Sequence, residues 1–227
     1  PEFEYIHFEK SQSEVLHELS TKLRRDVVRK LWNFVEYDSR LKAMASQEML
    51  LSVASKLVGS KTELFANQAL IKPPNVGREK PWHQDHAFGP PRSNDDILAV
   101  GLAIDDMTLE NACLLVIPGS HAGRIYDHHQ DGAFVGAVTE PGFTPEGAVP
   151  VELRAGGISI HHFRLLHGSA PNTSSRPRRL LLLEYAAVDA WPLLGADWET
   201  FKTSILRGEP SFEPRLSSVP VRMPLPP

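Results

Sequence analysis

The chain has little of several features that would place it in a specialised class. It contains a single cysteine, Cys113, so no internal disulfide can form, and we expect a reducing compartment such as the cytoplasm. No apolar run approaches the roughly 20 residues that a membrane-spanning helix requires. Residues 1–4 lack the basic and then apolar pattern of a signal peptide. The net charge of −4 gives no indication of a nucleic-acid or membrane partner.

The composition itself is that of an ordinary globular protein. Hydrophobic residues make up 41% of the chain and charged residues 23%. A length of 227 residues is enough for one domain with a substantial core. We expect a single domain over residues 1–227, with helical support in 1–60, a β core in 61–190 and a proline-rich extension in 191–227.

The first 60 residues predict two helices. A capping box of Ser11 and Glu14 precedes an apolar stripe that recurs every four residues: Val15, Leu19, Leu23, Val27, Leu31 and Val35. A second helix is expected over residues 46–58, with Gly59 as its C-terminal stop. Its inward residues are expected to be Leu50, Val53 and Leu57.

From residue 63 onward the pattern changes to short strands separated by Pro, Gly and Asn. Strands are expected over residues 64–72, 97–105, 113–117, 150–153, 158–162 and 179–187, and a short helix over 197–207. Many short strands with turn signals favour a mainly β fold, a sandwich or jelly roll with helices packed on one side. The Gly-rich segment 123–147 has no periodicity, which is typical of a functional or disordered loop. We expect it to close over a site.

Three residues form a candidate metal site. His83 and Asp85 are two residues apart, so on a strand both side chains share one face, whereas on a helix they would point about 200° apart. With the distant His167 the set becomes two imidazoles and one carboxylate. This is the facial triad of non-haem Fe(II) oxygenases, which leaves metal positions open. Catalytic zinc sites use similar ligands, so zinc stays an alternative.

A basic residue follows the last of these ligands at a distance of eleven residues. Arg178 carries a planar, permanently charged fork that suits a carboxylate. An open metal site beside a carboxylate-binding arginine favours 2-oxoglutarate and O2 as cosubstrates over zinc chemistry. Ser169, two residues after His167, can add a hydroxyl donor on the same strand face. Arg176 and Arg179 are expected to be solvated.

Three motifs in this order resemble the phytanoyl-CoA dioxygenase family. They are Pro81-Trp82-His83-Gln84-Asp85-His86, the run from Glu110 to His121 that contains Asn111-Ala112-Cys113 and Pro118-Gly119-Ser120-His121, and His167-Gly168-Ser169 followed by Arg178. The resemblance covers about residues 50–188. It implies a double-stranded β-helix that binds Fe(II) through His83, Asp85 and His167 and uses 2-oxoglutarate and O2. It also implies that Arg178 pairs with the C5-carboxylate of 2-oxoglutarate.

The resemblance adds two further cosubstrate contacts and shows two departures. Lys72, in Lys72-Pro73-Pro74, matches a family lysine that contacts 2-oxoglutarate, and Gln68 lies where some relatives place a glutamine. The family often has Gly where this chain has Ala112, and Ala tolerates a positive φ poorly, so a different turn is expected there. Some relatives carry a Trp near the cosubstrate where this chain has Leu102.

The remaining histidines are weighed against a structural role. His128 and His129 lie in the 123–147 loop, where we expect solvated side chains. His161 and His162 are adjacent, so one faces inward, and the family pattern places His162 near the site. For His162 a pocket role and a buried structural role are both open. His86 is expected on the strand face opposite Asp85, and His121 is interpreted as structural.

The sequence therefore predicts an Fe(II)/2-oxoglutarate-dependent dioxygenase that hydroxylates a small molecule and forms succinate and CO2. The alternative is a cupin-like jelly roll that binds metal for ligand binding or sensing, without turnover. A carboxylate ligand favours hydroxylation over halogenation, because halogenating relatives lack it. An anionic substrate is suggested by residues near the motifs: Phe88, Arg92, Arg124, His162 and Arg164. No nucleic-acid or membrane partner is expected.

Overall fold

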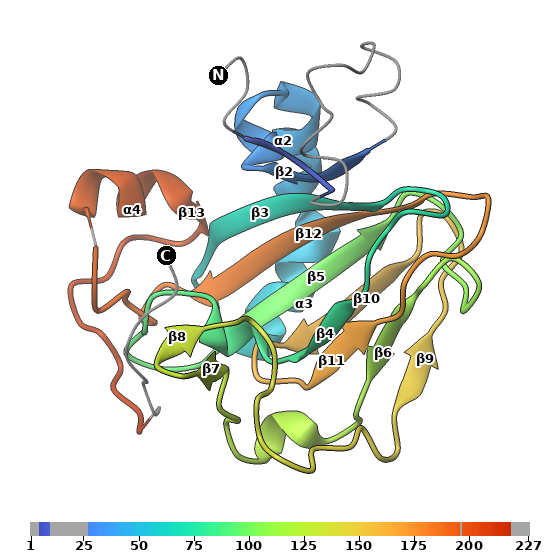
Figure 1. Ribbon diagram of the computed structural model, residues 1–227. Coiled ribbons are helices and arrows are strands. Elements are labelled where there is room, and N and C mark those ends of the chain that lie inside the picture. Colours follow the sequence, from blue (N-terminus) through green and yellow to red (C-terminus); the bar gives the residue numbers. More distant parts are fainter. Residues whose placement is uncertain (1–4, 10–26, 196, 219–227) are drawn as a thin grey trace.

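The computed structural model describes residues 5–9, 27–195 and 197–218, and most of the strands among them form one large antiparallel sheet. Its order is β1-β2-β3-β12-β5-β10, and β13 also pairs with β3. The strands are β1 (Ile6–Phe8), β2 (Val28–Trp32), β3 (Thr62–Lys72), β5 (Ile97–Ala103), β10 (Ile158–His162), β12 (Arg178–Ala187) and β13 (Ile205–Arg207). β3 and β12 lie at its centre (Figure 1).

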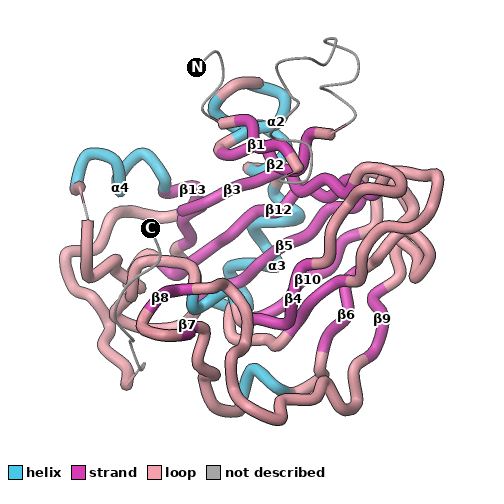
Figure 2. The backbone as a smooth tube through the Cα atoms, in the orientation of Figure 1, coloured by secondary structure: helices cyan, strands magenta, loops and turns pink. Residues whose placement is uncertain are grey.

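A smaller antiparallel sheet faces the interior side of this large sheet. Its order is β4-β11-β6-β9, with β4 (Lys80–His83), β11 (His167–Ser169), β6 (Leu114–Val116) and β9 (Val149–Val151). A separate hairpin joins β7 (His129–Gln130) to β8 (Ala133–Phe134). Figure 2 shows how the loops join the strands of the two sheets. The mainly β prediction is confirmed, and the architecture is a jelly roll.

Short helices cover the other face of the large sheet. They are η2 (Phe34–Glu36), α2 (Ser39–Ala45) and α3 (Glu48–Val58), and Figure 1 shows α3 running behind β12 and β5. Alternate side chains of β12 point toward them: Leu183 and Tyr185 are fully buried, and the Tyr185 hydroxyl donates to the Ala45 carbonyl at 2.8 Å. The opposite face of β12, which carries Arg178 and Glu184, is therefore free to line the interior between the sheets.

The predicted helix over residues 46–58 is confirmed as α3, but its buried face is rotated. Leu50, Leu51, Ala54 and Val58 are buried, whereas Val53 and Leu57 are exposed. The spacing of apolar residues is compatible with either face, because the helix is apolar on more than one side. Contact with β12 selects the face with the small Ala54, which allows a close approach.

The prediction of a first helix continuing to Val35 is wrong at its C-terminal end. Residues 28–32 form β2, which pairs with β3, and residues 10–26 lie outside the described residues. A spacing of four residues is a multiple of two, so it also places apolar residues on one face of a strand. Val27 and Leu31 fit the helix pattern and the strand pattern equally well. The pairing of β2 with β3 decides in favour of the strand.

The other strand predictions match β3, β5, β6, β9, β10 and β12, with ends that shift by one or two residues. The helix expected over 197–207 is shorter, because α4 (Trp198–Ser204) gives way to β13, which pairs with β3. The Asp197 side chain caps this helix by accepting from the Thr200 amide at 2.7 Å. No helix in the described part of the chain is long and apolar enough to cross a membrane.

The turn at Asn111-Ala112-Cys113 keeps the backbone that a glycine would favour. Ala112 has φ +68°, so our expectation of a different turn is wrong. The fully buried Asn111 side chain stabilises this conformation, since its Oδ1 accepts from the Thr108 amide at 2.8 Å and its Nδ2 donates to the Asp106 carbonyl at 2.8 Å. These bonds offset the cost of a left-handed alanine.

Asn111→Ala should lower the free energy of unfolding by about 1–3 kcal/mol, because buried backbone groups lose their partners. Urea unfolding followed by circular dichroism measures this loss. The matched control is Glu110→Ala, which removes only an exposed ion pair to Arg176 at 3.2 Å and should change stability by less than about 0.5 kcal/mol. Equal stability of both variants would contradict the role given to Asn111.

Candidate metal centre

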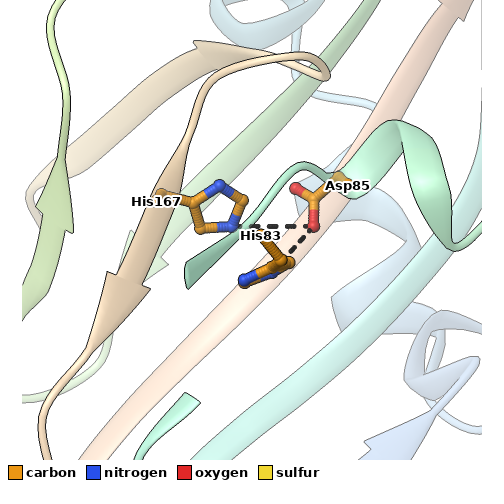
Figure 3. Close-up of side chains that lie close together, drawn as sticks. All are labelled: His83, Asp85 and His167. Carbon is orange, nitrogen blue, oxygen red and sulfur yellow. Dashed lines mark ion pairs between the residues drawn. The ribbon is translucent and has the colours of Figure 1, made fainter. Parts of the chain in front are cut away.

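Three side chains from β4, β11 and the turn after β4 point toward one point in the interior. The Nε2 atoms of His83 and His167 lie 3.4 and 3.6 Å from Asp85 Oδ1 (Figure 3). Ligand atoms of all three residues lie within 4.8 Å of one another, and among the described residues this is the one such group of three. Metal bonds of about 2.1 Å at right angles place ligand atoms about 3 Å apart. The donor set therefore fits a metal ion with little adjustment.

The orientation of both imidazoles is set by the backbone. His83 Nδ1 lies 2.8 Å from the Pro81 carbonyl, and His167 Nδ1 lies 2.9 Å from the Leu165 carbonyl. A carbonyl can only accept, so each Nδ1 carries the proton and donates it. Each Nε2 then keeps its lone pair for a metal, which is how metal-binding histidines are commonly oriented.

Burial sets the charge of the three groups. Desolvation lowers the pKa of His167 to about 3 and also lowers the pKa of His83, so both imidazoles are neutral at pH 7. Burial by itself would raise the Asp85 pKa, but the neighbouring His167, His161 and His83 hold it well below its usual range. The site thus offers two neutral nitrogen donors and one carboxylate anion without deprotonation at neutral pH.

Asp85 does not lie on a strand, contrary to the reasoning that grouped it with His83. β4 ends at His83, and Asp85 begins the 3-10 helix η3 (Asp85–Ala87). The two side chains still share a side because Gln84 between them keeps an extended backbone, with φ −117° and ψ 131°. His167 faces them because it is the cross-strand partner of His83.

A fourth histidine lies beside the group. His161 Nε2 is 3.4 Å from Asp85 Oδ2, the oxygen that His83 and His167 do not face. The sequence left a pocket role and a structural role open for His162, and the structure places His161 rather than His162 beside the triad. His162 points the other way on β10, where its Nδ1 accepts from the Arg164 amide at 3.1 Å. Strand alternation alone allows either His161 or His162 to face the interior. The pairing of His161 with Ala99 of β5 makes His161 the one that does.

The prediction that His128 is a solvated loop residue is also wrong. His128 is buried, with its Nδ1 2.9 Å from the Tyr126 carbonyl and its Nε2 accepting from the Gln84 amide at 3.0 Å. Both ring nitrogens are therefore engaged away from a metal. The fully buried Gln84 side chain also binds the loop, since its Nε2 donates to the Arg124 carbonyl at 3.1 Å. The base of the 123–147 loop is thus anchored next to the metal group.

Arg178 and Lys72 form a second polar group on the face of the large sheet that lines the interior. They are cross-strand partners on β12 and β3, and both are buried. The Arg178 side chain has no hydrogen bond or ion pair to a described residue, and its Nε is buried without a partner. Desolvation lowers the pKa of Arg178 to about 10, and desolvation together with Arg178 lowers that of Lys72 to about 7. Lys72 is only partly charged at pH 7, so the buried Arg178, which has no ion pair to a described residue, is the group that favours a bound anion.

The other predicted cosubstrate residues lie around this pair. Ser169 is buried on β11, and the Lys72 ammonium donates to the Ser169 carbonyl at 3.3 Å and to the Ala170 carbonyl. Gln68 shares a face of β3 with Lys72, but its amide donates to Glu184 Oε1 at 3.0 Å. Burial raises the pKa of Glu184 to about 7.

Of the residues suggested for substrate binding, Phe88 lies at the site. Its ring packs edge-on against the His83 ring, with 5.2 Å between centroids. The three arginines have acidic partners instead: Arg92 pairs with Glu63, Arg124 with Glu140, and Arg164 with Asp95 at 2.9 Å. These arginines therefore contribute little free positive charge.

Comparison with known families agrees with this geometry. The family model described as Phytanoyl-CoA dioxygenase matches residues 5–180, which include the metal group and Arg178. The chain belongs to the phytanoyl-CoA dioxygenase family. Among curated members, a probable alpha-ketoglutarate-dependent hypophosphite dioxygenase of Stutzerimonas stutzeri is 34% identical over 98% of this chain and 77% of its own length.

A further relative and a solved structure are also similar to this chain. A probable phytanoyl-CoA dioxygenase of Caenorhabditis elegans is 29% identical over 68% of this chain, which spans about half (53%) of that relative. The crystal structure of EvdO2 from Micromonospora carbonacea var. aurantiaca complexed with 2-oxoglutarate is 27% identical, with a TM-score of 0.58 over 74% of this chain and 73% of that one.

Proposed function

We propose that this protein is an Fe(II)/2-oxoglutarate-dependent dioxygenase whose iron is held by His83, Asp85 and His167. The observation that carries the proposal is the triad with two free Nε2 atoms, placed in the same interior as the unpaired Arg178. Two histidines and one carboxylate would hold the iron and leave room for a keto acid and O2 as cosubstrates. Family membership supports the same assignment.

Arg178 is the partner that we assign to the C5-carboxylate of 2-oxoglutarate. A guanidinium without an acidic partner can bind a carboxylate through two parallel hydrogen bonds. Lys72 adds positive charge beside it, and the Ser169 hydroxyl lies on the strand that also carries His167. Gln68 is the least direct of the proposed contacts, because Glu184 already engages its amide.

The protein residues orient the reactants and exclude water from them. When bound, Fe(II) supplies the activation of O2, with 2-oxoglutarate leaving as succinate and CO2 and one oxygen atom entering the substrate. Asp85 provides the single negative ligand, and the buried histidines provide neutral ones. The Phe88 ring beside His83 covers one side of the group with apolar surface.

We assign a small anionic molecule as the substrate class. The hypophosphite dioxygenase named above makes phosphorus oxyanions the first compounds to screen. Ferrous iron and the buried free thiol of Cys113, whose pKa is raised by burial, both suit a reducing location such as the cytoplasm.

Succinate formation tests the function. The protein is incubated with Fe(II), 2-oxoglutarate, ascorbate and a panel of small anions, and product masses are examined for a gain of one oxygen. If the protein is an enzyme, it forms succinate, and the amount of succinate increases when one compound of the panel is added. The cupin-like alternative, a binding or sensing protein, retains metal and 2-oxoglutarate but forms no succinate with any compound.

His161→Ala should weaken metal binding by about 10–100-fold, the usual effect of losing a group that orients a ligand. The variant leaves Asp85 Oδ2 without its partner at 3.4 Å and frees the carboxylate to rotate. Equilibrium dialysis with Fe(II) under anaerobic conditions measures the affinity. His162→Ala, on the opposite face of the same strand, is the control and should bind iron normally. An equal loss in both variants would contradict the orienting role.

A further inference from the structure

Two lysines, one from each sheet, lie in the interior without an acidic partner. Lys30 belongs to β2 of the large sheet, and Lys80 begins β4 of the small sheet. Neither ammonium group has an ion pair or a hydrogen bond to an acid among the described residues, and Glu184 and Asp85 act on Lys30, and Asp85 on Lys80, only through their charge. Lysines that are half-buried or more usually pair with a carboxylate, so these two need another explanation.

A bulge turns Lys80 toward the metal group. On β11, Ser169 follows His167 by two residues, so both side chains share one face. On β4 their cross-strand partners, Lys80 and His83, are three residues apart, which means that β4 carries one extra residue. Without the bulge Lys80 would point away from His83, and with it Lys80 faces the same interior.

The register of β2 turns Lys30 inward as well. Lys30 is the cross-strand partner of Leu70 on β3, and Leu70 shares its face with Lys72, two residues on. The Lys72 ammonium reaches the Ser169 carbonyl of the small sheet, so this face of β3 lines the space between the sheets. Lys30 therefore projects into the same space, from the side opposite Lys80.

Aromatic rings support both ammonium groups. Lys30 Nζ lies 3.6 Å from the Trp32 ring centroid, and Lys80 Nζ lies 4.1 Å from the ring centroid of Phe88, which packs against His83. A ring face attracts a cation without occupying its N–H donors in ordinary hydrogen bonds. Both lysines thus keep donors for a ligand beside the metal group.

The charge of Lys80 acts on Lys30, and the charge of Asp85 in the metal group acts on both lysines. Desolvation, and then the charge of Lys80, lower the pKa of Lys30 to about 8, and desolvation lowers that of Lys80 to about 8 as well. Both remain largely charged at pH 7. The charge of Asp85 raises the pKa of Lys80, and the charge of Arg29 lowers it. Lys30 and Lys80 occupy other positions than Lys72 and Arg178, since Lys30 is the cross-strand partner of Leu70 and Lys80 is that of Ser169.

We propose that Lys30 and Lys80 form an anion subsite that binds the charged group of the substrate beside the metal. This inference rests on the proposed function and deepens it, since it names the residues that select a small oxyanion. The two lysines belong to opposite sheets, and each ammonium group lies over one ring, Trp32 for Lys30 and Phe88 for Lys80. An anion between them would be bound by charge-assisted hydrogen bonds from both sides.

Calorimetric titration with sulfate tests the subsite. The protein is loaded with Zn(II), a redox-inert substitute for iron, and with saturating 2-oxoglutarate, so that Arg178 is occupied. Lys30→Met and Lys80→Met keep the apolar stems and should each weaken sulfate binding at least about tenfold. The matched control is Lys56→Met at an exposed position of α3, which should bind sulfate like the wild type. The affinity for 2-oxoglutarate should stay within about twofold in all variants.

Three outcomes would overturn the proposal. The first is no sulfate binding by the wild type, and the second is unchanged sulfate binding by the Lys30→Met/Lys80→Met double variant. The third is a tenfold loss of 2-oxoglutarate affinity in Lys80→Met while sulfate binding stays intact. Lys30→Arg and Lys80→Arg keep the charge and should retain most sulfate binding, which keeps the test decisive if a Met variant fails to fold. Failure of the wild type to bind metal and 2-oxoglutarate would instead refute the proposed function. The sulfate titration of metal-free protein would still decide the subsite.

Discussion

Asp85→Ala is expected to abolish succinate formation and to weaken Fe(II) binding by about 10²–10³-fold. The carboxylate is the only anion of the triad, and removing one member of a buried charge arrangement typically costs ~3–5 kcal/mol. The fold should survive, because burial keeps His83 and His167 neutral without the carboxylate. Anaerobic equilibrium dialysis and a succinate assay measure the two effects, and circular dichroism verifies the fold.

The control for this substitution is His121→Ala. His121 is exposed and does not belong to the triad, so iron affinity and turnover should be unchanged. Asp85→Glu is informative because it keeps the charge but moves the oxygen by one methylene, and it should retain part of the metal affinity with little turnover. Normal iron affinity in Asp85→Ala, or an equal loss in His121→Ala, would refute the ligand assignment.

Arg178→Ala is expected to raise the 2-oxoglutarate requirement by at least tens of fold. Truncating one partner of a buried charge pair typically costs ~2–5 kcal/mol. Iron affinity should barely change, because Arg178 is not a ligand. Arg178→Lys should recover only part of the affinity, since an ammonium keeps the charge but loses the planar fork. Turnover measured against 2-oxoglutarate concentration gives the effect.

The neighbouring arginines provide the controls. Arg179 pairs with Asp105 at 2.6 Å and Arg176 with Glu110 at 3.2 Å, and both side chains are exposed. Arg176→Ala and Arg179→Ala should leave the 2-oxoglutarate requirement unchanged. A larger effect in either control than in Arg178→Ala would refute the assignment, and a normal 2-oxoglutarate requirement in all three variants would make Lys72 the main carboxylate partner.

The local spacing of residues was enough to identify the candidate site. His83 and Asp85 are close in the chain, and the short extended link through Gln84 keeps them on one side even though the strand ends between them. Ser169 shares a strand with His167 for the same reason. Strand alternation acts over two or three residues, so it can be read from the sequence alone.

The same alternation could not choose between equivalent faces. His161 and His162 are interchangeable by sequence, as are the strand and helix interpretations of Val27 and Leu31. His128 looked solvated because its neighbours are polar and Gly-rich, whereas its burial comes from the distant Gln84. In each case the deciding contact joins residues far apart in the chain.

The sequence by itself determined the jelly-roll class, the metal-binding residue types and the family, because strand periodicity and motif spacing are local properties. The tertiary structure decided which side chains meet. Pairing of β12 with β3 brings Arg178 beside Lys72, and pairing of β11 with β4 sets His167 opposite His83. The bulge in β4 turns Lys80 inward. Strand register and bulges depend on the packing of the whole sheet, so no short stretch of sequence encodes them.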